Sequence, residues 1–184
     1  MGFSIAEELY QLGAEVVLIS GPSAQQLQNK KIKRIDVISA AEMHEAVSQH
    51  YSQADITVMS AAVADYQPEL VAKEKIKKKE ASFAINLVKT VDILSELGSQ
   101  KKPGQVLIGF ALETENEQEH AIQKLQKKNL DLIVLNSLKD EGAGFKGDTN
   151  KITLIDKKLE IKTFELKTKS EVAADICQKI LSLV

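Results

Sequence analysis

The sequence predicts an α/β fold in which helices cover both faces of a mostly parallel sheet. Short β-branched apolar runs alternate along the chain with segments whose apolar residues recur every three or four positions. This alternation is typical of parallel strands joined by helical crossovers. The chain has 184 residues, 43% of them hydrophobic, which is enough for one core without a disulfide or metal. We therefore expect a single domain over residues 1–184.

The first half of the chain is predicted to begin inside a helix. Apolar residues recur at helical spacing over residues 3–12, and Gly13 follows where a helix C-cap is expected. Ser39 and Glu42 have the spacing of a capping box, which opens a helix that ends near Tyr51. Predicted strands cover residues 14–20, 33–39 and 55–60. Because no strand precedes the first helix, we expect an N-terminal strand to be missing.

The second half continues the alternation and then changes character. Helices are predicted over residues 92–97 and 117–128, and strands over 106–110 and 130–135. Residues 151–155 and 160–164 flank a short turn and predict a hairpin at one sheet edge, followed by a helix capped by Thr168 and Glu171. Residues 75–79 and 83–88 do not fit the pattern, and we expect them to form two strands of a projecting arm.

Composition and charge exclude several classes of protein. The 24 basic residues nearly balance the 26 acidic ones, so we expect no nucleic-acid partner. No apolar run approaches the roughly 20 residues of a membrane helix, so we expect no membrane partner. Cys177 is the only cysteine, which indicates a reducing compartment and predicts a cytoplasmic protein.

Small residues and a carboxylate follow the strand predicted over residues 55–60. Ligands of open parallel sheets bind beyond the carboxyl ends of the strands, so this loop is a candidate site. Ala61 and Ala62 would let a ligand approach the backbone, and Asp65 would offer a carboxylate to a sugar hydroxyl, a base amine or a hydrated metal. The alternative is a packed turn in which Asp65 serves only as a cap.

Two groups of lysines indicate an anionic ligand. On a strand, Lys75, Lys77 and Lys79 would point to one side and form a cationic row that suits a polyphosphate. Lys124 and Lys128 are four residues apart on a predicted helix and share one face, where like charges are slightly destabilising. The alternatives are an edge strand protected by lysines and an ordinary polar helix face.

These motifs occur in an order that resembles phosphopantothenoylcysteine synthetase. The resemblance rests on Ala-Ala-Val-Ala-Asp-Tyr at 61–66, Glu-Lys-Ile-Lys-Lys at 74–78, Gly-Phe at 109–110 and Lys-Lys-Asn-Leu-Asp at 127–131. More specifically, the sequence resembles the synthetase half of the bacterial bifunctional coenzyme A biosynthesis protein, whose other half is an FMN-dependent decarboxylase. It implies a Rossmann-like homodimeric ligase that joins 4′-phosphopantothenate to L-cysteine with CTP and Mg²⁺ through an acyl-cytidylate.

The resemblance also implies roles for individual residues. Asp65 and the catalytic Lys75 would contact the nucleotide, and residues 75–88 would form a dimerisation arm. The segment implied to contact the cytidine is Val91, Asp92, Ile93 and Leu94. Phe110 would pack against the nucleotide, and Lys124 and Lys128 would bind its triphosphate. Ala61 and Ala62 would line the substrate cleft, and the polar residues implied on the ligand side are Asn136, Asp148 and Asn150.

The sequence also departs from the family pattern. The glycine-rich, phosphate-binding loop expected before the first helix does not occur in it, and Thr90–Val91 stands where many relatives have Asn-Pro. Two other interpretations stay open. One is an NAD(P)-binding Rossmann oxidoreductase, although the sequence has no Gly-x-Gly-x-x-Gly. The other is a non-catalytic module that dimerises through the arm.

Overall fold

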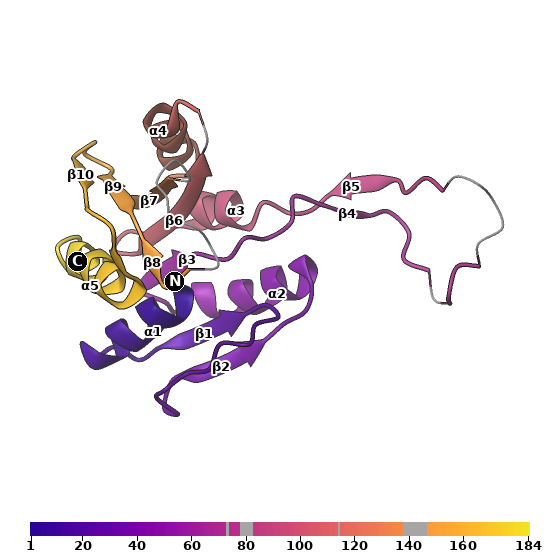
Figure 1. Ribbon diagram of the computed structural model, residues 1–184, viewed down its shortest axis with the longest axis horizontal. Helices are drawn as coiled ribbons and strands as arrows, with labels where there is room; N and C mark the ends of the chain where they lie inside the picture. The colour runs from indigo at the N-terminus through magenta and orange to yellow at the C-terminus, as the bar shows by residue number, and fades with distance from the viewer. Residues whose placement is uncertain (73, 78–82, 114, 138–146) are drawn as a thin grey trace.

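A five-stranded, mainly parallel sheet forms the centre of the computed structural model, which describes residues 1–72, 74–77, 83–113, 115–137 and 147–184 (Figure 1). Its strands, in spatial order, are β10 (Ile161–Thr163), β9 (Ile152–Asp156), β7 (Leu132–Ser137), β6 (Val106–Glu113) and β3 (Ile56–Met59). β3, β6 and β7 are parallel, whereas β9 and β10 are antiparallel to their neighbours. The predicted α/β class and the hairpin at the sheet edge are thus confirmed.

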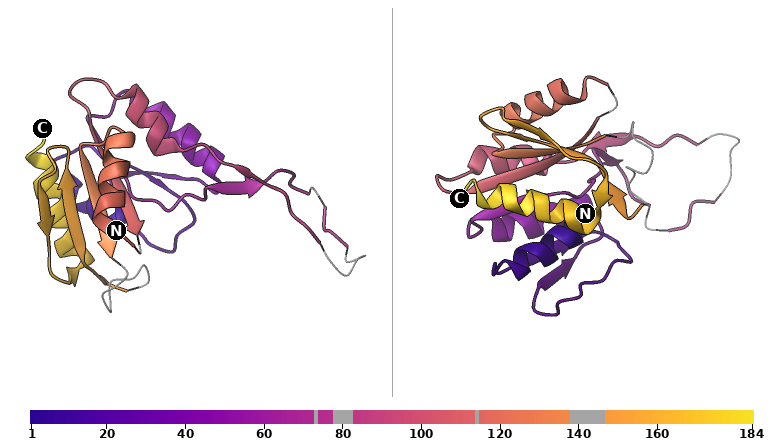
Figure 2. Two further views of the ribbon diagram at one scale, coloured as in Figure 1. Left: turned by 90° about the horizontal axis from the view of Figure 1, so that it is seen from above. Right: turned by 60° about the vertical axis from the view of Figure 1, so that its left-hand side comes forward.

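Helices cover both faces of this sheet, as predicted. They are α1 (Gly2–Gln11), α2 (Ala40–Tyr51), α3 (Ile93–Gln100), α4 (Glu117–Lys127) and α5 (Lys169–Leu181). Successive strand residues point to opposite faces. On β6, Leu107 joins a core formed with α2, α3 and α4, whereas Ile108 joins a core formed with α1 and α5. Figure 2 shows α5 lying beside α1. The two faces of β6 therefore belong to two separate cores.

Side chains at the helix ends explain where α2 and α5 begin. The Ser39 hydroxyl accepts from the Glu42 N–H. The Glu42 carboxylate accepts from the Ser39 hydroxyl and from the Ile38 N–H, in place of the Ser39 N–H that a complete capping box would use. Thr168 and Glu171 make both bonds of a capping box at α5. Such caps satisfy backbone donors that the helix leaves free. The sequence signals for these helix starts are confirmed.

The first two strands form a sheet of their own, which the sequence does not predict. β1 (Val17–Ser20) and β2 (Lys33–Asp36) pair in parallel, and Figure 1 shows them apart from the central sheet. In the described part of the chain, neither strand pairs with β3. A further small sheet joins β8 (Thr149–Asn150) to β11 (Lys167–Thr168). The expected single sheet is therefore divided between β1 and β3.

A long arm extends from the body between β3 and α3 (Figures 1 and 2). At its base β4 (Tyr66–Pro68) pairs antiparallel with β5 (Leu87–Lys89). The strand predicted over residues 75–79 is wrong where it can be examined, because residues 75–77 have no strand structure and 78–79 lie outside the described residues. Pairing occurs at the base of the arm instead, where its two segments lie closest together.

A buried carboxylate holds the end of the central sheet where β6 and β7 begin. Asp131 is 4% exposed and accepts from Lys101 Nζ at 2.9 Å, Lys157 Nζ at 3.1 Å and the Leu107 N–H at 2.9 Å. Buried charges are tolerated when they are paired in this way.

Among the described residues, no helix is both long and apolar enough to cross a membrane.

Candidate functional site

The predicted site residues are distributed over both faces of the central sheet and along the arm. β6 runs to Glu113, three residues beyond the predicted end of the strand. The side chain of Glu113 follows Leu107 and Ala111 in strand alternation, so it lies on the face covered by α2, α3 and α4. The segment expected to be a loop after Phe110 is therefore strand, and it brings a carboxylate to the helical face.

The two helical lysines are both paired with carboxylates on this face. Lys124 Nζ donates to Glu113 Oε1 at 2.5 Å, and Lys128 Nζ forms an ion pair with Asp92 at 2.9 Å. The partners come from different elements, since Glu113 ends β6 and Asp92 precedes α3. Long side chains on helices point toward the helix N-terminus, which directs Lys124 back toward Glu113. Lys124 is thus tied to the end of β6 and Lys128 to the start of α3.

Asp92 both caps α3 and pairs with Lys128. It is the N-cap of α3, where its carboxylate accepts from the Ser95 N–H at 3.1 Å and the Ser95 hydroxyl at 2.8 Å. Partial burial raises the pKa of Asp92, but its bonds from Lys128 and Ser95 more than offset this effect and lower the pKa below its usual value. Asp92 therefore stays ionised and keeps Lys128 beside the start of α3.

A close backbone contact fixes α3 against the end of α4. A Cβ atom at Gly98 would lie 1.9 Å from the Lys128 carbonyl oxygen, so only glycine fits there without a shift of the backbone. The Asn129 amide also donates to the Gly98 carbonyl at 2.9 Å. These contacts set the position of the Lys128 backbone relative to Asp92.

The other residues of the segment 91–94 face different surroundings. Val91 is 50% exposed, whereas Ile93 is buried in the core and Leu94 packs against that core. Ile93 and Leu94 support α3 from within the protein. Of the three apolar side chains, Val91 is the one that a ligand at this edge can reach.

Phe110 and Asn136 lie on the opposite face of the sheet from Lys124. Phe110 packs against the core formed with α1 and α5. Asn136 Oδ1 accepts from the side-chain amide of Asn150, a buried residue of β8, at 2.9 Å. Asp148 is exposed, and its carbonyl accepts from the backbone of Lys169. The structure thus joins Asn136 and Asn150, and it separates both from the two lysines.

The alanine pair and Asp65 follow β3 and lead into the arm. Ala61, Ala62 and Asp65 are exposed. The Asp65 carbonyl accepts from the Thr90 N–H at 2.9 Å, and the Thr90 hydroxyl donates to the Ala64 carbonyl. These bonds place Asp65 at the base of the arm. Thr90 therefore joins the end of the arm to the residues just before its start.

Lys75 lies farther along the arm and is exposed. Among the described residues, no hydrogen bond or ion pair connects it to Asp65, Lys124 or Lys128. The neighbouring Lys73, Lys78 and Lys79 lie outside the described residues. A single chain therefore brings together the helical lysines, Glu113 and Asp92, but it does not bring Lys75 to them.

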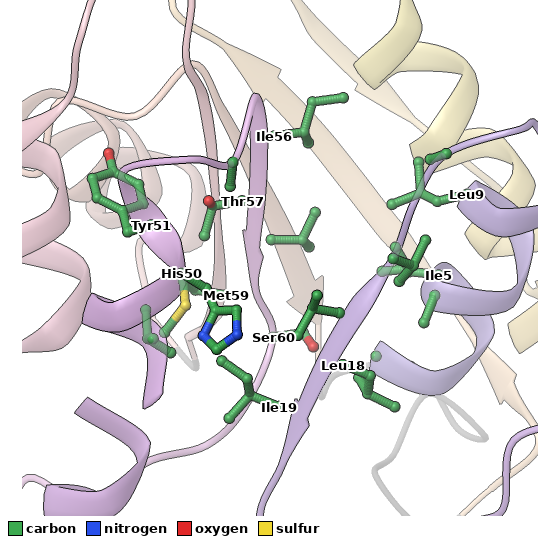
Figure 3. Close-up of a pocket in the computed structure, with 18 of the residues that line it drawn as sticks. Ile5, Leu9, Leu18, Ile19, His50, Tyr51, Ile56, Thr57, Met59 and Ser60 are labelled. Atoms are coloured by element: carbon green, nitrogen blue, oxygen red, sulfur yellow. The ribbon is translucent and has the colours of Figure 1, made fainter. Parts of the chain in front are cut away.

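A cavity of about 530 Å³ separates β1 from β3 (Figure 3). Apolar side chains line it from both layers, with Ile5 and Leu9 of α1 on one side and Met43 and Val47 of α2 on the other. The facing edges of β1 and β3 pair with no strand in the described part of the chain. The cavity is thus bounded by two parallel strands and two apolar helix faces.

The residues offer carboxylates for a metal, but not as a preformed cluster. Within the described ranges, no group of three or more histidine, cysteine or acidic side chains could hold an ion. Mg²⁺ is commonly bound through one or two carboxylates together with substrate phosphates. The exposed Asp65 fits that manner of binding.

Comparison with known proteins identifies the family. Residues 1–183 match the family described as DNA/pantothenate metabolism flavoprotein C-terminal domain. The chain belongs to this family. Its α/β architecture fits this membership.

Relatives within this family carry two different names. A protein of an unknown prokaryotic organism, named Cysteine/Cysteine sulfinic acid decarboxylase, is 52% identical over 184 residues, which are all of this chain and 51% of that protein. The Coenzyme A biosynthesis bifunctional protein CoaBC of Bacillus subtilis (strain 168) is 44% identical over 183 residues, or 100% of this chain and 45% of that protein. The chain thus spans about half the length of these curated relatives.

A solved structure agrees with the architecture. The crystal structure of the C-terminal domain of a Coenzyme A biosynthesis bifunctional protein CoaBC is 40% identical and superposes with a TM-score of 0.83. The match covers 99% of this chain and 81% of that chain. The family resemblance inferred from the sequence motifs is confirmed.

Sequence reasoning missed the carboxylate partners of the two lysines. The Lys128–Asp92 contact joins residues 36 positions apart, and no local spacing reveals it. For Glu113 a signal existed, because strand alternation from Leu107 would have placed its carboxylate on the helical face. Finding it required extending the strand beyond Phe110.

Proposed function

We propose that this domain is a phosphopantothenate–cysteine ligase of coenzyme A biosynthesis, which uses CTP and forms an acyl-cytidylate intermediate. The observation that carries the proposal is the pair of cations on α4, Lys124 and Lys128, held by carboxylates at the end of β6 and the start of α3 in a chain related to CoaBC. Triphosphates bind where ammonium groups converge, and the sequence motifs of the synthetase resemblance supply the rest of the site.

The chemistry needs charge and alignment rather than a protein nucleophile. The substrate carboxylate attacks the α-phosphorus of CTP, a bond to the bridging oxygen breaks, and pyrophosphate leaves. Lys124 and Lys128 would stabilise the triphosphate charge during this step, and Lys75 would act as the catalytic cation. The cysteine amine then attacks the acyl carbonyl, loses a proton, and CMP leaves as the amide forms.

The remaining residues bind and orient the substrates. Val91 and the backbone beside Asp92 are proposed to contact the cytidine, and Asp65 would hold Mg²⁺ on the phosphates. When bound, Mg²⁺ would neutralise phosphate charge. On the other face, Phe110 and the Asn136–Asn150 amide pair would face the phosphopantothenate side. Ala61 and Ala62 leave the cleft open between these two parts.

Amide formation tests the assignment. With 4′-phosphopantothenate, L-cysteine, CTP and Mg²⁺, we expect pyrophosphate and CMP in equal amounts with the amide product. Lys75→Gln should abolish turnover, whereas Lys89→Gln, an exposed change at the base of the same arm, should leave most of it. Full turnover by Lys75→Gln would show that the central assignment is wrong. Calorimetric titration with CTP and with ATP measures the nucleotide preference separately.

The name of one relative calls for a discriminating assay. A decarboxylase would release CO₂ from cysteine or cysteine sulfinate without a nucleotide, whereas the proposed ligase consumes CTP and releases none. We expect no CO₂ from this domain, and we assign any decarboxylation, with its FMN, to a fused or associated domain. CO₂ release from the isolated chain would favour the other name.

The arm is proposed to join two copies of the chain. Large apolar side chains on it are exposed, including Leu70 at 87% and Phe83 at 68%. Exposed apolar surface of this kind is typical of an interface. Phe83→Asp with Ile85→Asp should convert a dimer to a monomer in sedimentation, whereas Lys75→Gln should leave the dimer intact. A wild-type monomer at micromolar concentration would contradict the proposal.

The cavity between β1 and β3 is proposed to take one more parallel strand, which would precede α1. A Cβ atom at Gly2 would lie 2.7 Å from the Ser60 hydroxyl, so α1 begins beside the carboxyl end of β3, where such a strand would end. A right-handed crossover would then join it to β1. In a form extended by an apolar strand and a phosphate-binding loop, the amides of β1 and β3 should exchange more slowly; unchanged exchange would refute this.

The proposed setting is the cytoplasm, where coenzyme A biosynthesis would use the domain. Cys177 is the chain's only cysteine and is a buried free thiol, which fits a reducing compartment. Fractionation of cells that express the full-length protein tests this placement.

A further inference from the structure

Glu113 is bonded to a cation that the proposed function needs for its ligand. Its side chain is 16% exposed, and Oε1 accepts from Lys124 Nζ, whose side chain is 44% exposed. His120 lies one helical turn before Lys124, with Nδ1 3.6 Å from Glu113 Oε2. One carboxylate thus faces two basic side chains of α4, and its strand holds it at the edge where the ligand would enter.

We propose that Glu113 is the counter-ion of Lys124 in the polyphosphate site. Its carboxylate holds the Lys124 ammonium until an anionic ligand takes the place of the carboxylate. The inference rests on the proposed function, because it assumes that Lys124 binds phosphate. A lysine already paired with a carboxylate must exchange that partner, or share its donors, when the anion arrives. Glu113 therefore lowers the affinity of the site for polyphosphate and keeps the Lys124 ammonium in place between turnovers.

The neighbouring ion pair of Lys128 and Asp92 differs from the pair of Lys124 and Glu113. Asp92 also caps α3 through Ser95, so releasing Lys128 from Asp92 would leave the cap in place but remove the charge that balances it. Among the described residues, Glu113 makes no bond that begins or ends a helix. The exchange of partners is accordingly assigned to Lys124, and Lys128 is the more fixed of the two cations.

Substitution of Glu113 gives a result that a structural role would not give. Removing a structural carboxylate weakens a site, whereas removing a competing counter-ion strengthens it. For a half-exposed ion pair, we expect Glu113→Gln to bind inorganic triphosphate about two- to fivefold more tightly than wild type. The gain should disappear in the double variant Glu113→Gln/Lys124→Met, because the freed ammonium is then absent.

A matched ion pair between β11 and α5 supplies the control. Lys167 and Asp175 are joined at 2.6 Å with side-chain exposures of 36% and 18%, close to those of Lys124 and Glu113. Asp175→Asn removes the same kind of charge away from α3 and α4 and should leave triphosphate affinity unchanged. Melting temperatures of both single variants report any general loss of structure.

The measurement is calorimetric titration of inorganic triphosphate into the four proteins at fixed ionic strength. Tighter binding by Glu113→Gln alone supports the counter-ion role. Equal or weaker binding by Glu113→Gln, with wild type binding normally, overturns it. If wild type binds triphosphate but makes no amide product, the proposed function fails and the counter-ion role is still decided by the variant. If wild type binds no triphosphate, both fail.

Discussion

Replacing the buried carboxylate at Asp131 should destabilise the fold strongly. Asp131→Ala leaves the Lys101 ammonium, on a side chain only 12% exposed, without its buried partner, and it leaves the Leu107 N–H without an acceptor. Breaking a buried ion pair by removing one partner costs about 3–5 kcal/mol. For a domain of this size, each kcal/mol lowers the melting temperature by roughly 2–4 °C, so we expect a fall of about 10 °C.

Two companion variants separate the causes. Lys157 donates to the same carboxylate, but its side chain is 60% exposed, so Lys157→Met should cost less than about 1 kcal/mol. The double variant Asp131→Leu/Lys101→Met removes both buried charges and should recover much of the loss. Urea unfolding followed by circular dichroism gives each free energy. A loss below about 1 kcal/mol for Asp131→Ala would refute the reasoning.

Three other predictions concern stability and reactivity. Gly98→Ala must move the backbone at Lys128, so we expect a loss of more than about 1 kcal/mol in urea unfolding together with weaker triphosphate binding; an unchanged protein would contradict the close contact. Burial raises the pKa of Asp156, but the bond from Lys179 and two backbone N–H groups outweigh it and lower the pKa. The ionised Asp156 carboxylate therefore stabilises the fold above its unfolded pKa of ~4, and this stability is lost as the pH falls through the lower folded pKa. The free energy of unfolding of Asp156→Asn should accordingly depend less steeply on pH in acid than that of wild type. Burial raises the pKa of the Cys177 thiol to about 12, so iodoacetamide at pH 8 should modify it only after unfolding, and rapid native labelling would be inconsistent with this burial.

The order of helices and strands was predictable because it depends on local patterns. Apolar spacing placed α1 and α4, and the hydroxyl and carboxylate pair at Thr168 and Glu171 placed the start of α5. These signals lie within one or two turns of the chain. Periodicity shows which face of a segment is buried, but it does not show which strands pair, so the separation of β1 from β3 was not predictable.

The positions of the two helical lysines were predictable, but their carboxylate partners were not. Lys124 and Lys128 stand four residues apart on a polar helix face, which the sequence shows directly. Their carboxylates come from β6 and from the residue before α3, and only the packing of those elements brings them close. The lysine-rich segment of the arm suggested a strand, but strand pairing depends on which segments lie close together. Among the described residues of the arm, pairing occurs at its base, where Tyr66 lies opposite Lys89.

The geometry of that base has a consequence for how the family can vary. The chain enters the arm at Asp65 and leaves it at Thr90, and these two residues are hydrogen-bonded to each other. Entry and exit are therefore adjacent, so residues between them can be lengthened, shortened or exchanged for those of a relative without changing the path of the chain through the central sheet. The arm can thus vary in length and surface by insertion and deletion while the ion pairs of Lys124 and Lys128 keep their positions.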